Sequence, residues 1–279
     1  MSCVKEPDIK DILINALAED IGTRDITTEA IIPSDKFVNA ALLAKEDCVI
    51  CGLGEAMVVF ELKDKKIKFT PLVKEGVWVK KGRAIARISG KARSILTAER
   101  VALNFLSFLS GIATATREYT EAVKPHKVKI IDTRKTIPGL RILEKYAVRI
   151  GGGFNHRLSL DEMVMVKDNH LKAIGGHKKL TKLSRRYKSE IEVEGLAGFE
   201  DALKLNPDII MLDNMSIKNM KKAVSIRNSL SNRPAPKLEA SGNITLKNVK
   251  KVASCGVDMI SVGALTHSVK SVDISLEIL

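Results

Sequence analysis

The sequence predicts an α/β protein in which an N-terminal α+β domain precedes a parallel α/β barrel. From residue 128 onward, short apolar runs alternate with helical patterns, an order typical of parallel strands joined by crossover helices. Six such runs occur, and this repetition favours a barrel over a doubly wound open sheet. The chain contains neither a G-x-G-x-x-G motif nor a P-loop, which argues against the common nucleotide-binding open sheets.

Residues 1–112 are expected to form the N-terminal domain, including a helix that bridges to the barrel. Apolar residues in segment 7–21 recur at helical spacing, and this helix is expected to end near Gly22. Between residues 37 and 90 the pattern changes to short β-type runs punctuated by glycines. Residues 94–123 then predict one or two long helices, with a break at Gly111.

The barrel domain is placed at residues 113–266. Its strands are expected at 128–131, 163–166, 191–193, 209–212, 238–240 and 259–262. Helices are expected between most of them, at 198–205, 217–230 and 245–255. In such a barrel the carboxyl ends of the strands lie at one rim, and that rim carries the active site.

Composition narrows the classes of function. The formal net charge of +13 suits nucleic acid, an anionic membrane surface or small polyanions. Aromatic residues make up only 4% of the chain, so platforms for stacking single-stranded bases are scarce. No apolar run approaches the roughly 20 residues of a membrane-spanning helix. A soluble protein is therefore expected, and most of its positive charge is expected to lie on solvated helix faces.

The cysteines predict a reducing compartment. Four cysteines are too few for a disulfide framework, and no secretory signal pattern opens the chain, so a cytoplasmic location is expected. Cys48 and Cys51 have the spacing of a redox motif, but strand-forming residues separate them and no second pair completes a zinc site. Both are expected to be ordinary half-buried cysteines.

Polar residues follow nearly every predicted barrel strand. Residues that serve only to end a strand are expected to be turn formers. Six strand ends with charged or hydroxyl-bearing side chains are hard to explain as turns alone. The ends are Asp132-Thr133-Arg134-Lys135, Lys167-Asp168-Asn169-His170, Glu192-Val193-Glu194, Asp213-Asn214, Glu239-Ala240-Ser241-Gly242-Asn243 and Ser261-Val262-Gly263-Ala264.

The basic residues among these ends predict a substrate with more than one carboxylate. Guanidinium groups bind carboxylates through two parallel hydrogen bonds, and lysines add compact point charges. A glycine-rich segment at 151–157 contributes a histidine and an arginine to the same group. The members are Arg134, Lys135, His156, Arg157 and Lys167.

The acidic residues predict a magnesium ion carried largely by substrate phosphates, because carboxylate oxygens suit this cation. The expected ligands are Asp168, Glu194 and Asp213. Glu192 projects to the same side of its strand as Glu194, since side chains two residues apart in a strand share a face. Glu194 is favoured because it lies nearer the barrel mouth, but the choice between the two stays open.

Small residues end the last two predicted strands. The ends at Ser241-Gly242-Asn243 and Ser261-Val262-Gly263-Ala264 can present backbone amides to a phosphate, the usual arrangement in phosphate-binding barrels. Carboxylate-binding cations, a metal and a phosphate cradle together point to a phosphorylated sugar that reacts with a polyacid.

Several of these runs resemble the motifs of the quinolinate phosphoribosyltransferase family, in order and over nearly the whole chain. Earlier segments agree too, namely 19–22, 25–27 and 97–104. The runs in the barrel are Asp132-Thr133-Arg134-Lys135-Thr136, Pro138-Gly139-Leu140-Arg141, Glu144-Lys145-Tyr146-Ala147-Val148, residues 151–157, Lys167-Asp168-Asn169-His170, Leu212-Asp213-Asn214, Glu239-Ala240-Ser241-Gly242 and residues 261–267.

The resemblance implies a fold and a reaction. An N-terminal α/β sandwich domain, completed by the C-terminal segment 267–279, would pack on an incomplete parallel α/β barrel in a homodimer. The enzyme would transfer phosphoribosyl from phosphoribosyl pyrophosphate (PRPP) to quinolinate with decarboxylation, a step of NAD biosynthesis. The relatives associated with molybdenum transport are the closest alternative, but the full set of cations argues against them. A basic nucleic-acid-binding protein is the alternative from another class, and its affinity would fall steeply with salt.

The resemblance also implies roles for individual residues. The quinolinate carboxylates would be held by Arg134, His156, Arg157 and Lys167, and Arg100 would reach the site of the neighbouring subunit. The ribose, the pyrophosphate and its magnesium would be surrounded by Lys135, Glu194, Asp213, Asp168 and Asn169. Phosphate would be cradled by Ser241, Gly242, Ser261 and Gly263. Asn243 departs from the family's pattern by standing where a second glycine is expected, but asparagine tolerates the left-handed backbone.

Overall fold

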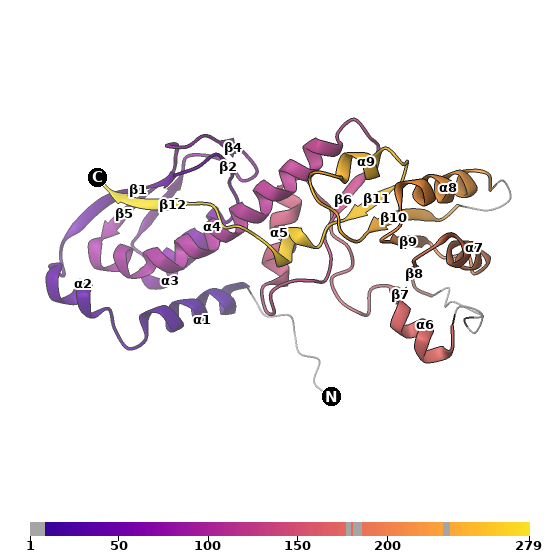
Figure 1. Cartoon of the computed structure of the whole chain (residues 1–279). Helices are drawn as coiled ribbons and strands as arrows, with labels where there is room; N and C mark the ends of the chain where they lie inside the picture. The colour runs from indigo at the N-terminus through magenta and orange to yellow at the C-terminus, as the bar shows by residue number, and fades with distance from the viewer. Residues whose placement is uncertain (1–8, 177–179, 181–185, 231–234) are drawn as a thin grey trace. The chain divides into compact units, whose positions relative to one another are not determined.

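The computed structural model describes residues 9–176, 180, 186–230 and 235–279 of the chain. The chain forms two compact units (Figure 1). The first unit comprises Met1–Arg117, Thr136–Gly152 and Thr266–Leu279, and the second comprises Glu118–Lys135 and Gly153–Leu265. Compared with a division after residue 112, the first unit therefore also takes up residues 136–152.

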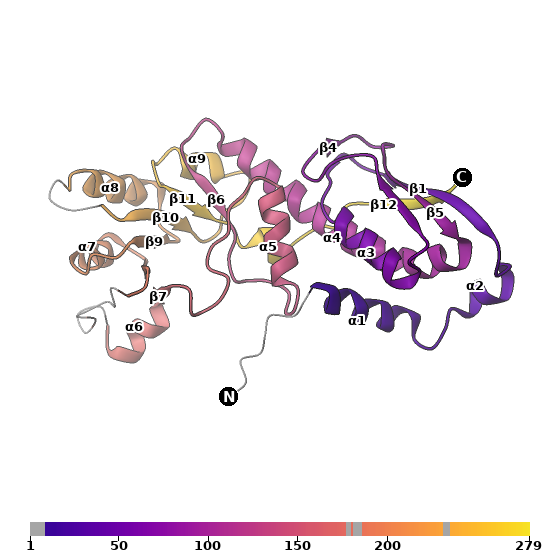
Figure 2. The ribbon, with the colours of Figure 1, turned by 180° about the vertical axis from the view of Figure 1, so that it is seen from behind.

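The first unit is an α/β sandwich, in which an antiparallel sheet lies against helices (Figures 1 and 2). Its sheet has the order β12-β1-β5-β3 and consists of β1 (Phe37–Ala44), β3 (Lys68–Pro71), β5 (Ala84–Lys91) and β12 (Ile274–Ile278). A ribbon pairs β2 (Cys48–Val49) with β4 (Trp78–Val79). The helices are α1 (Ile9–Ile21), α2 (Ile26–Ile31), α3 (Leu53–Lys63), α5 (Arg141–Ile150) and most of α4 (Ala92–Val123).

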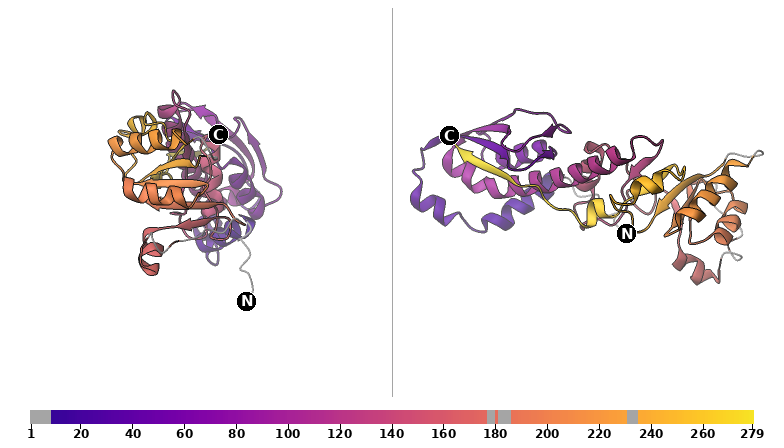
Figure 3. Two further views of the ribbon diagram at one scale, coloured as in Figure 1. Left: turned by 90° about the vertical axis from the view of Figure 1, so that its right-hand side faces the viewer. Right: turned by 45° about the horizontal axis from the view of Figure 1, so that its top comes forward.

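The C-terminal strand completes this N-terminal sheet. The yellow strand in Figure 3 is β12, and it pairs antiparallel with β1 from Ile274 opposite Ala44 to Ile278 opposite Ala40. The core beneath the sheet is apolar, because Leu42, Ile88 and Phe60 are fully buried or nearly so. The fold class expected for this domain is confirmed.

Helix α4 is one continuous helix of 32 residues, so the predicted break at Gly111 is wrong. A Cβ atom at this glycine would overlap the backbone oxygen of Lys270. The glycine therefore permits a close approach of the C-terminal segment. By length and composition α4 could cross a membrane, which corrects the expectation that no apolar segment is long enough. Most of the apolar stretch is buried within the protein, however, as in the core helix of a soluble protein.

Cys48 and Cys51 are fully buried, rather than half-buried as expected from the sequence. Burial raises the pKa of the Cys48 thiol to about 11 and raises the pKa of Cys51 further. Because the thiolate is the reactive form of cysteine, this environment suits packing and not redox chemistry. The interpretation of the pair as unreactive thiols agrees with this environment.

The second unit contains the incomplete barrel. Its six strands are all parallel and have the order β6-β11-β10-β9-β8-β7, so that β6 and β7 are the two edges. The strands are β6 (Lys129–Ile131), β7 (Val164–Val166), β8 (Ser189–Val193), β9 (Ile209–Asp213), β10 (Lys237–Ser241) and β11 (Met259–Ser261). The helices are α6 (Asp168–Ile174), α7 (Leu196–Lys204), α8 (Ile217–Asn228), α9 (Val249–Ala253) and the beginning of α10 (Ala264–His267).

All six predicted barrel strands are present within a few residues of their expected positions. Figure 2 shows the parallel strands from behind, with α7, α8 and α9 on the outside. Beyond the edge strand β6, the glycine-rich segment adds a further pairing, because Ile131 forms a bridge with Phe154. This pairing brings the loop that follows Gly153 to the inner face of the sheet.

Candidate active site

The carboxyl ends of the barrel strands surround a cavity of about 390 Å³. Each of the six strands contributes at least one residue to it, directly or through the residues that follow the strand. The cavity is lined by Thr133, Arg134, Lys135, His156, Arg157, Met165, Lys167, Glu192, Met211, Asp213, Glu239, Ser241 and Ser261. Alternation along each strand explains this lining, since residues two apart face the same side. Seven of the predicted carboxylate-binding and phosphate-binding residues therefore meet in one place, namely Arg134, Lys135, His156, Arg157, Lys167, Ser241 and Ser261.

One wall of the cavity carries the guanidinium groups of Arg134 and Arg157 and suits an anion. Burial, and then the neighbouring charge of Arg134, lowers the pKa of the Arg157 guanidinium. Two cations that face each other in this way raise each other's energy until an anion lies between them. Arg157 is held in place by its Nη1, which donates a hydrogen bond to the backbone oxygen of Met163 at 2.9 Å. The pair is thus preorganised for a carboxylate.

Lys167 also lines the cavity and forms an ion pair with Glu192, with 3.3 Å between Nζ and Oε2. Its backbone N–H donates to Nδ1 of His170 at 2.9 Å, so this histidine fixes the start of α6. Asp168, the next residue, pairs with Lys172 at 2.9 Å. The Lys167 ammonium group therefore lines the cavity, whereas the Asp168 carboxylate does not line it and pairs with Lys172.

The predicted acidic residues lie in two neighbouring hollows. Asp213 lines the main cavity together with Glu192, whose side chain is 13% exposed. Glu194 is exposed and lines an adjacent hollow of about 480 Å³ with Asp168. Glu192 borders both hollows. Strand β8 ends at Val193, so Glu194 already lies beyond the sheet.

The loops that follow β9 and β10 are tied together by asparagines. Asn243 adopts the left-handed conformation that its place in the loop requires, with φ of 51°, and its Nδ2 donates to Oδ1 of Asn214 at 2.9 Å. The backbone N–H of Asn214 donates in turn to the backbone oxygen of Ser241 at 2.9 Å. At Gly242, with φ of 88°, a Cβ atom would overlap the Asn214 amide. The side chain of Asn243 thus forms part of the predicted phosphate loop.

The glycine-rich loop is anchored by a buried carboxylate that the sequence had marked only as a strand end. Asp132 is fully buried, accepts a hydrogen bond from the backbone N–H of His156 at 2.8 Å, and also accepts one from the Asn155 side chain. Because both bonds end on the residue that directly follows β6, they fix where His156 and Arg157 enter the cavity.

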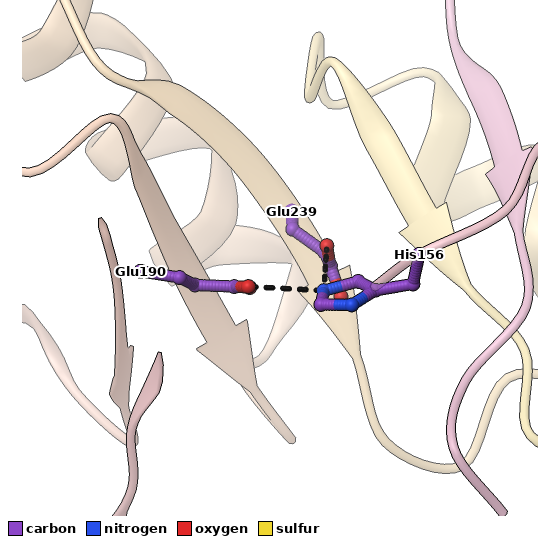
Figure 4. A group of neighbouring side chains, drawn as sticks. All are labelled: His156, Glu190 and Glu239. Atoms are coloured by element: carbon purple, nitrogen blue, oxygen red, sulfur yellow. Dashed lines mark hydrogen bonds and ion pairs between the residues drawn. The ribbon is translucent and has the colours of Figure 1, made fainter. Parts of the chain in front are cut away.

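Beneath the cavity, His156 meets two fully buried glutamates (Figure 4). Its Nε2 lies 2.9 Å from Oε2 of Glu190 and 3.6 Å from Oε2 of Glu239. Its Nδ1 accepts a hydrogen bond from the backbone N–H of Arg157 at 2.8 Å. The sequence analysis missed this arrangement. The available signal was Glu190, which lies two residues before Glu192 and so shares its face of β8.

The remaining predicted residues do not line this cavity. Gly263 follows β11, and Asn169 is the second residue of α6. Arg100 is an exposed residue of α4 in the first unit. Among the described residues, the only group of side chains with metal-ligand atoms within 4.8 Å of one another is His156, Glu190 and Glu239. The predicted set Asp168, Glu194 and Asp213 is thus not a ready-made metal cage.

Comparison with known proteins agrees with the motifs. Residues 25–110 match the model described as quinolinate phosphoribosyl transferase, N-terminal domain, and residues 112–277 match the model of the C-terminal domain. A probable nicotinate-nucleotide pyrophosphorylase (carboxylating) from Synechocystis is 44% identical over 94% of this chain and 90% of its own length. The chloroplastic nicotinate-nucleotide pyrophosphorylase (carboxylating) of Arabidopsis thaliana is 42% identical over 97% of this chain and 83% of its own.

Solved structures give the same result. The nicotinate-nucleotide pyrophosphorylase of Francisella tularensis superposes with a TM-score of 0.89 at 39% identity and covers 97% of this chain and 96% of its own. The corresponding protein of Ehrlichia chaffeensis gives a TM-score of 0.91 at 39% identity, with 98% and 100% covered. The likeness extends over both units of the fold.

Proposed function

Because the chain belongs to the quinolinate phosphoribosyltransferase family, we propose that it transfers the phosphoribosyl group of PRPP to quinolinate with loss of CO2. The products are nicotinate mononucleotide and pyrophosphate, which makes the protein a pentosyltransferase of NAD biosynthesis. One observation of the structure supports this most directly. The guanidinium groups of Arg134 and Arg157 line the same cavity as Lys167 and the carboxylate of Asp213.

The cationic wall suits the two carboxylates of quinolinate. Arg134 and Arg157 can bind one carboxylate through parallel hydrogen bonds, and Lys167 adds a point charge for the other. The methionine side chains of Met165 and Met211 supply the apolar surface against which a pyridine ring would lie. A cavity with this much positive charge discriminates against a ligand that lacks a carboxylate, because a buried cation would then stay unpaired.

The other half of the cavity suits PRPP. Lys135 follows β6, and Ser241 and Ser261 end β10 and β11. These hydroxyl groups, with the backbone around Gly242 and Gly263, lie where a barrel commonly binds phosphate. Asp213 stands on the strand next to Ser241 and faces it in register. It is therefore placed to accept hydrogen bonds from ribose hydroxyls.

The reaction begins when the pyridine nitrogen displaces pyrophosphate from the anomeric carbon. The new C–N bond takes the nitrogen lone pair, and the broken C–O bond leaves its electrons on pyrophosphate. Positive charge develops on the ribose, where the Asp213 carboxylate stabilises it, while Lys135 stabilises the leaving group. Magnesium bound to the phosphates would further stabilise the negative charge of the leaving pyrophosphate. The carboxylate oxygens of Asp213 and of Glu192 or Glu194 fit that hard cation.

The quaternised ring then loses CO2. The bond from C2 to its carboxylate breaks, and its electron pair stays at C2 beside the positive ring nitrogen, until a proton replaces the lost group. No covalent intermediate with the protein is needed. The cations of the pocket therefore act by orienting the ring and by holding the 3-carboxylate that remains.

Assembly and location complete the proposal. The active form is at least a homodimer, in which Arg100 of one protomer reaches the quinolinate pocket of its partner. Arg100 is exposed on α4, as such a role requires. The cytoplasm is the proposed location, on the basis of the low cysteine content.

One assay tests the reaction. The protein is incubated with PRPP, magnesium and quinolinate labelled at the 2-carboxylate, and nicotinate mononucleotide and labelled CO2 are measured together. Equal amounts of both products are expected. Nicotinate, which lacks the 2-carboxylate, serves as the matched control and should be a very poor substrate. Comparable turnover of nicotinate would place the protein among other phosphoribosyltransferases.

A further inference from the structure

His156, Arg157 and Glu239 form a partition inside the barrel. They line the candidate active-site cavity, and they also line a second cavity of about 300 Å³ that reaches Lys188, Ile209 and Met259 at the amino ends of the strands. A partition with open space on both sides is not held by close packing alone. Its geometry therefore depends on the polar contacts within it.

Two buried carboxylates supply those contacts. Glu190 and Glu239 are both fully inaccessible to solvent, and Glu190 binds the His156 Nε2 atom at 2.9 Å. Neither oxygen of Glu239 has a hydrogen-bond partner of normal geometry among the described residues. Burial, and then the adjacent Glu190, raise the pKa of Glu239 well above the ordinary carboxyl range. A neutral Glu239 beside a hydrogen-bonded Glu190 satisfies both observations.

The surroundings of the pair contain few compensating charges. The ionisable or polar groups that face Glu239 are Asp132 after β6, Lys167 after β7, Glu190 of β8 and Ser261 of β11. The loop contributes His156, and Arg157 interacts with Glu190. The single nearby ammonium group, Lys167, already pairs with Glu192. Two ionised glutamates here would leave an excess of buried negative charge below a pocket for a dianion.

We propose that Glu190 is a positioning residue that keeps the His156 ring in its Nε2-protonated form, and that this histidine in turn fixes Arg157 in the substrate pocket. In this form Nε2–H donates to Glu190, and Nδ1 is left to accept the backbone N–H of Arg157. The histidine is thus a link between the buried pair and the guanidinium that meets substrate. This assignment rests on the proposed function for its kinetic consequences only.

The two glutamates provide a matched pair of variants, because both are fully buried and the substitution is the same. Glu239→Gln replaces a neutral acid by a neutral amide and should leave the KM for quinolinate within about threefold of wild type. Glu190→Gln removes the charged acceptor of the His156 proton and should raise that KM about tenfold or more. The KM for PRPP should change by less than about twofold in Glu190→Gln, because Glu190 does not line the candidate active-site cavity.

A spectroscopic readout is independent of activity. The ¹⁵N signals of the His156 ring should show one tautomer, protonated at Nε2, in wild type and in Glu239→Gln. Glu190→Gln should give a mixture of ring forms. If Glu190→Gln proves unstable, His156 itself can be changed. His156→Gln can place an amide N–H near the Nε2 position and should retain more quinolinate affinity than His156→Asn, which cannot reach Glu190.

Three results would overturn the assignment. The first is equal loss of quinolinate affinity in Glu190→Gln and Glu239→Gln. The second is a His156 ring that is protonated at both nitrogens, or at Nδ1 alone, in the wild-type protein at neutral pH. The third is a stoichiometric transition metal in protein purified without chelator that is lost in Glu239→Gln, since a metal would then hold the three side chains. An inactive wild-type protein with the expected ring signals would instead contradict the proposed function.

Discussion

The buried carboxylate of Asp132 accepts a hydrogen bond from the backbone N–H of His156 at 2.8 Å. Asp132 directly follows β6, so it holds the loop that carries the two candidate site residues His156 and Arg157. The same carboxylate binds the Asn155 side chain. A residue that touches no substrate in this arrangement can therefore control where Arg157 lies.

Asp132→Asn tests this anchor. The amide keeps the shape of the side chain. One of the two oxygens that accept hydrogen bonds from the loop, however, becomes an NH2 group, which can only donate. We expect a loss of about 1–3 kcal/mol of unfolding free energy, together with a higher KM for quinolinate. Denaturant unfolding and steady-state kinetics measure the two effects. Asp161→Asn, which removes one exposed carboxylate from the same loop region, is the control and should change neither quantity.

Glu192→Gln and Glu194→Gln separate the two acidic candidates of β8. Glu192 lines the main cavity and pairs with Lys167, whereas Glu194 is exposed in the neighbouring hollow. We expect Glu192→Gln to lower kcat about a hundredfold, because its charge lines the main cavity and orients Lys167 through their ion pair. Glu194→Gln should lose less than about fivefold. The reverse order in initial-rate measurements would return the role to Glu194.

The difficulty with these two residues shows where sequence reasoning ends. The alternating pattern fixes which side of β8 each glutamate faces, but it does not fix where the strand stops. The structure ends β8 at Val193, which leaves Glu192 inside the barrel and Glu194 outside it. By contrast, Asp213 and Ser241 were expected at neighbouring strand ends, and they do lie opposite each other in register. Parallel strands bring such ends together by geometry alone.

The partition formed by His156, Arg157 and Glu239 could not be predicted from the sequence, for another reason. His156 is far along the chain from both Glu190 and Glu239, and their contact depends on how the glycine-rich loop enters the barrel after Phe154. Local periodicity carries no information on that path. Gly111 is a similar case, because its role is a close approach of the backbone at Lys270 and not a break in α4. Contacts between distant segments decided both outcomes.

The raised pKa of Glu239 predicts a pH dependence of stability. The folded protein holds a proton that the unfolded chain releases near the ordinary carboxyl pKa, so the stabilisation is complete below that pH. It is lost as pH rises through the pKa of the folded state, at no more than about 1.4 kcal/mol per pH unit. Glu239→Gln should therefore show a flatter curve of unfolding free energy against pH than wild type. The exposed Glu194→Gln should keep the wild-type slope; identical slopes in all three proteins would contradict the prediction.

Metal dependence follows from the open arrangement of the acidic residues. Asp168, Glu194 and Asp213 are not gathered within ligand distance of one another among the described residues, so we expect the site by itself to hold magnesium weakly. We expect activity to vanish with a chelator and to return with magnesium, and we expect magnesium to bind measurably only when PRPP is present. Calorimetric titrations of magnesium with and without PRPP check the second point. Full turnover without a divalent cation would count against this role for the acidic residues.

Subunit complementation tests whether the active site is shared. Arg100 is exposed on α4 in the first unit, while Lys167 lines the cavity of the second. If Arg100 serves the partner's pocket, Arg100→Ala and Lys167→Ala should each be nearly inactive as pure homodimers while staying folded. Exchange of subunits between them then rebuilds one intact site in each heterodimer, from the Arg100 of one protomer and the Lys167 of the other.

The size of the recovery distinguishes a shared site from a private one. Equal mixing makes about half of the dimers heterodimers, each with one of its two sites intact, so activity should rise to roughly a quarter of wild type. Mass spectrometry of differently labelled subunits confirms that exchange has taken place. Exchange without recovery would mean that Arg100 acts within its own protomer or only supports α4. A mixture of Arg134→Ala and Lys167→Ala is the matched control. Both changes affect the same cavity, so every heterodimer keeps two damaged sites whichever protomer supplies Arg100.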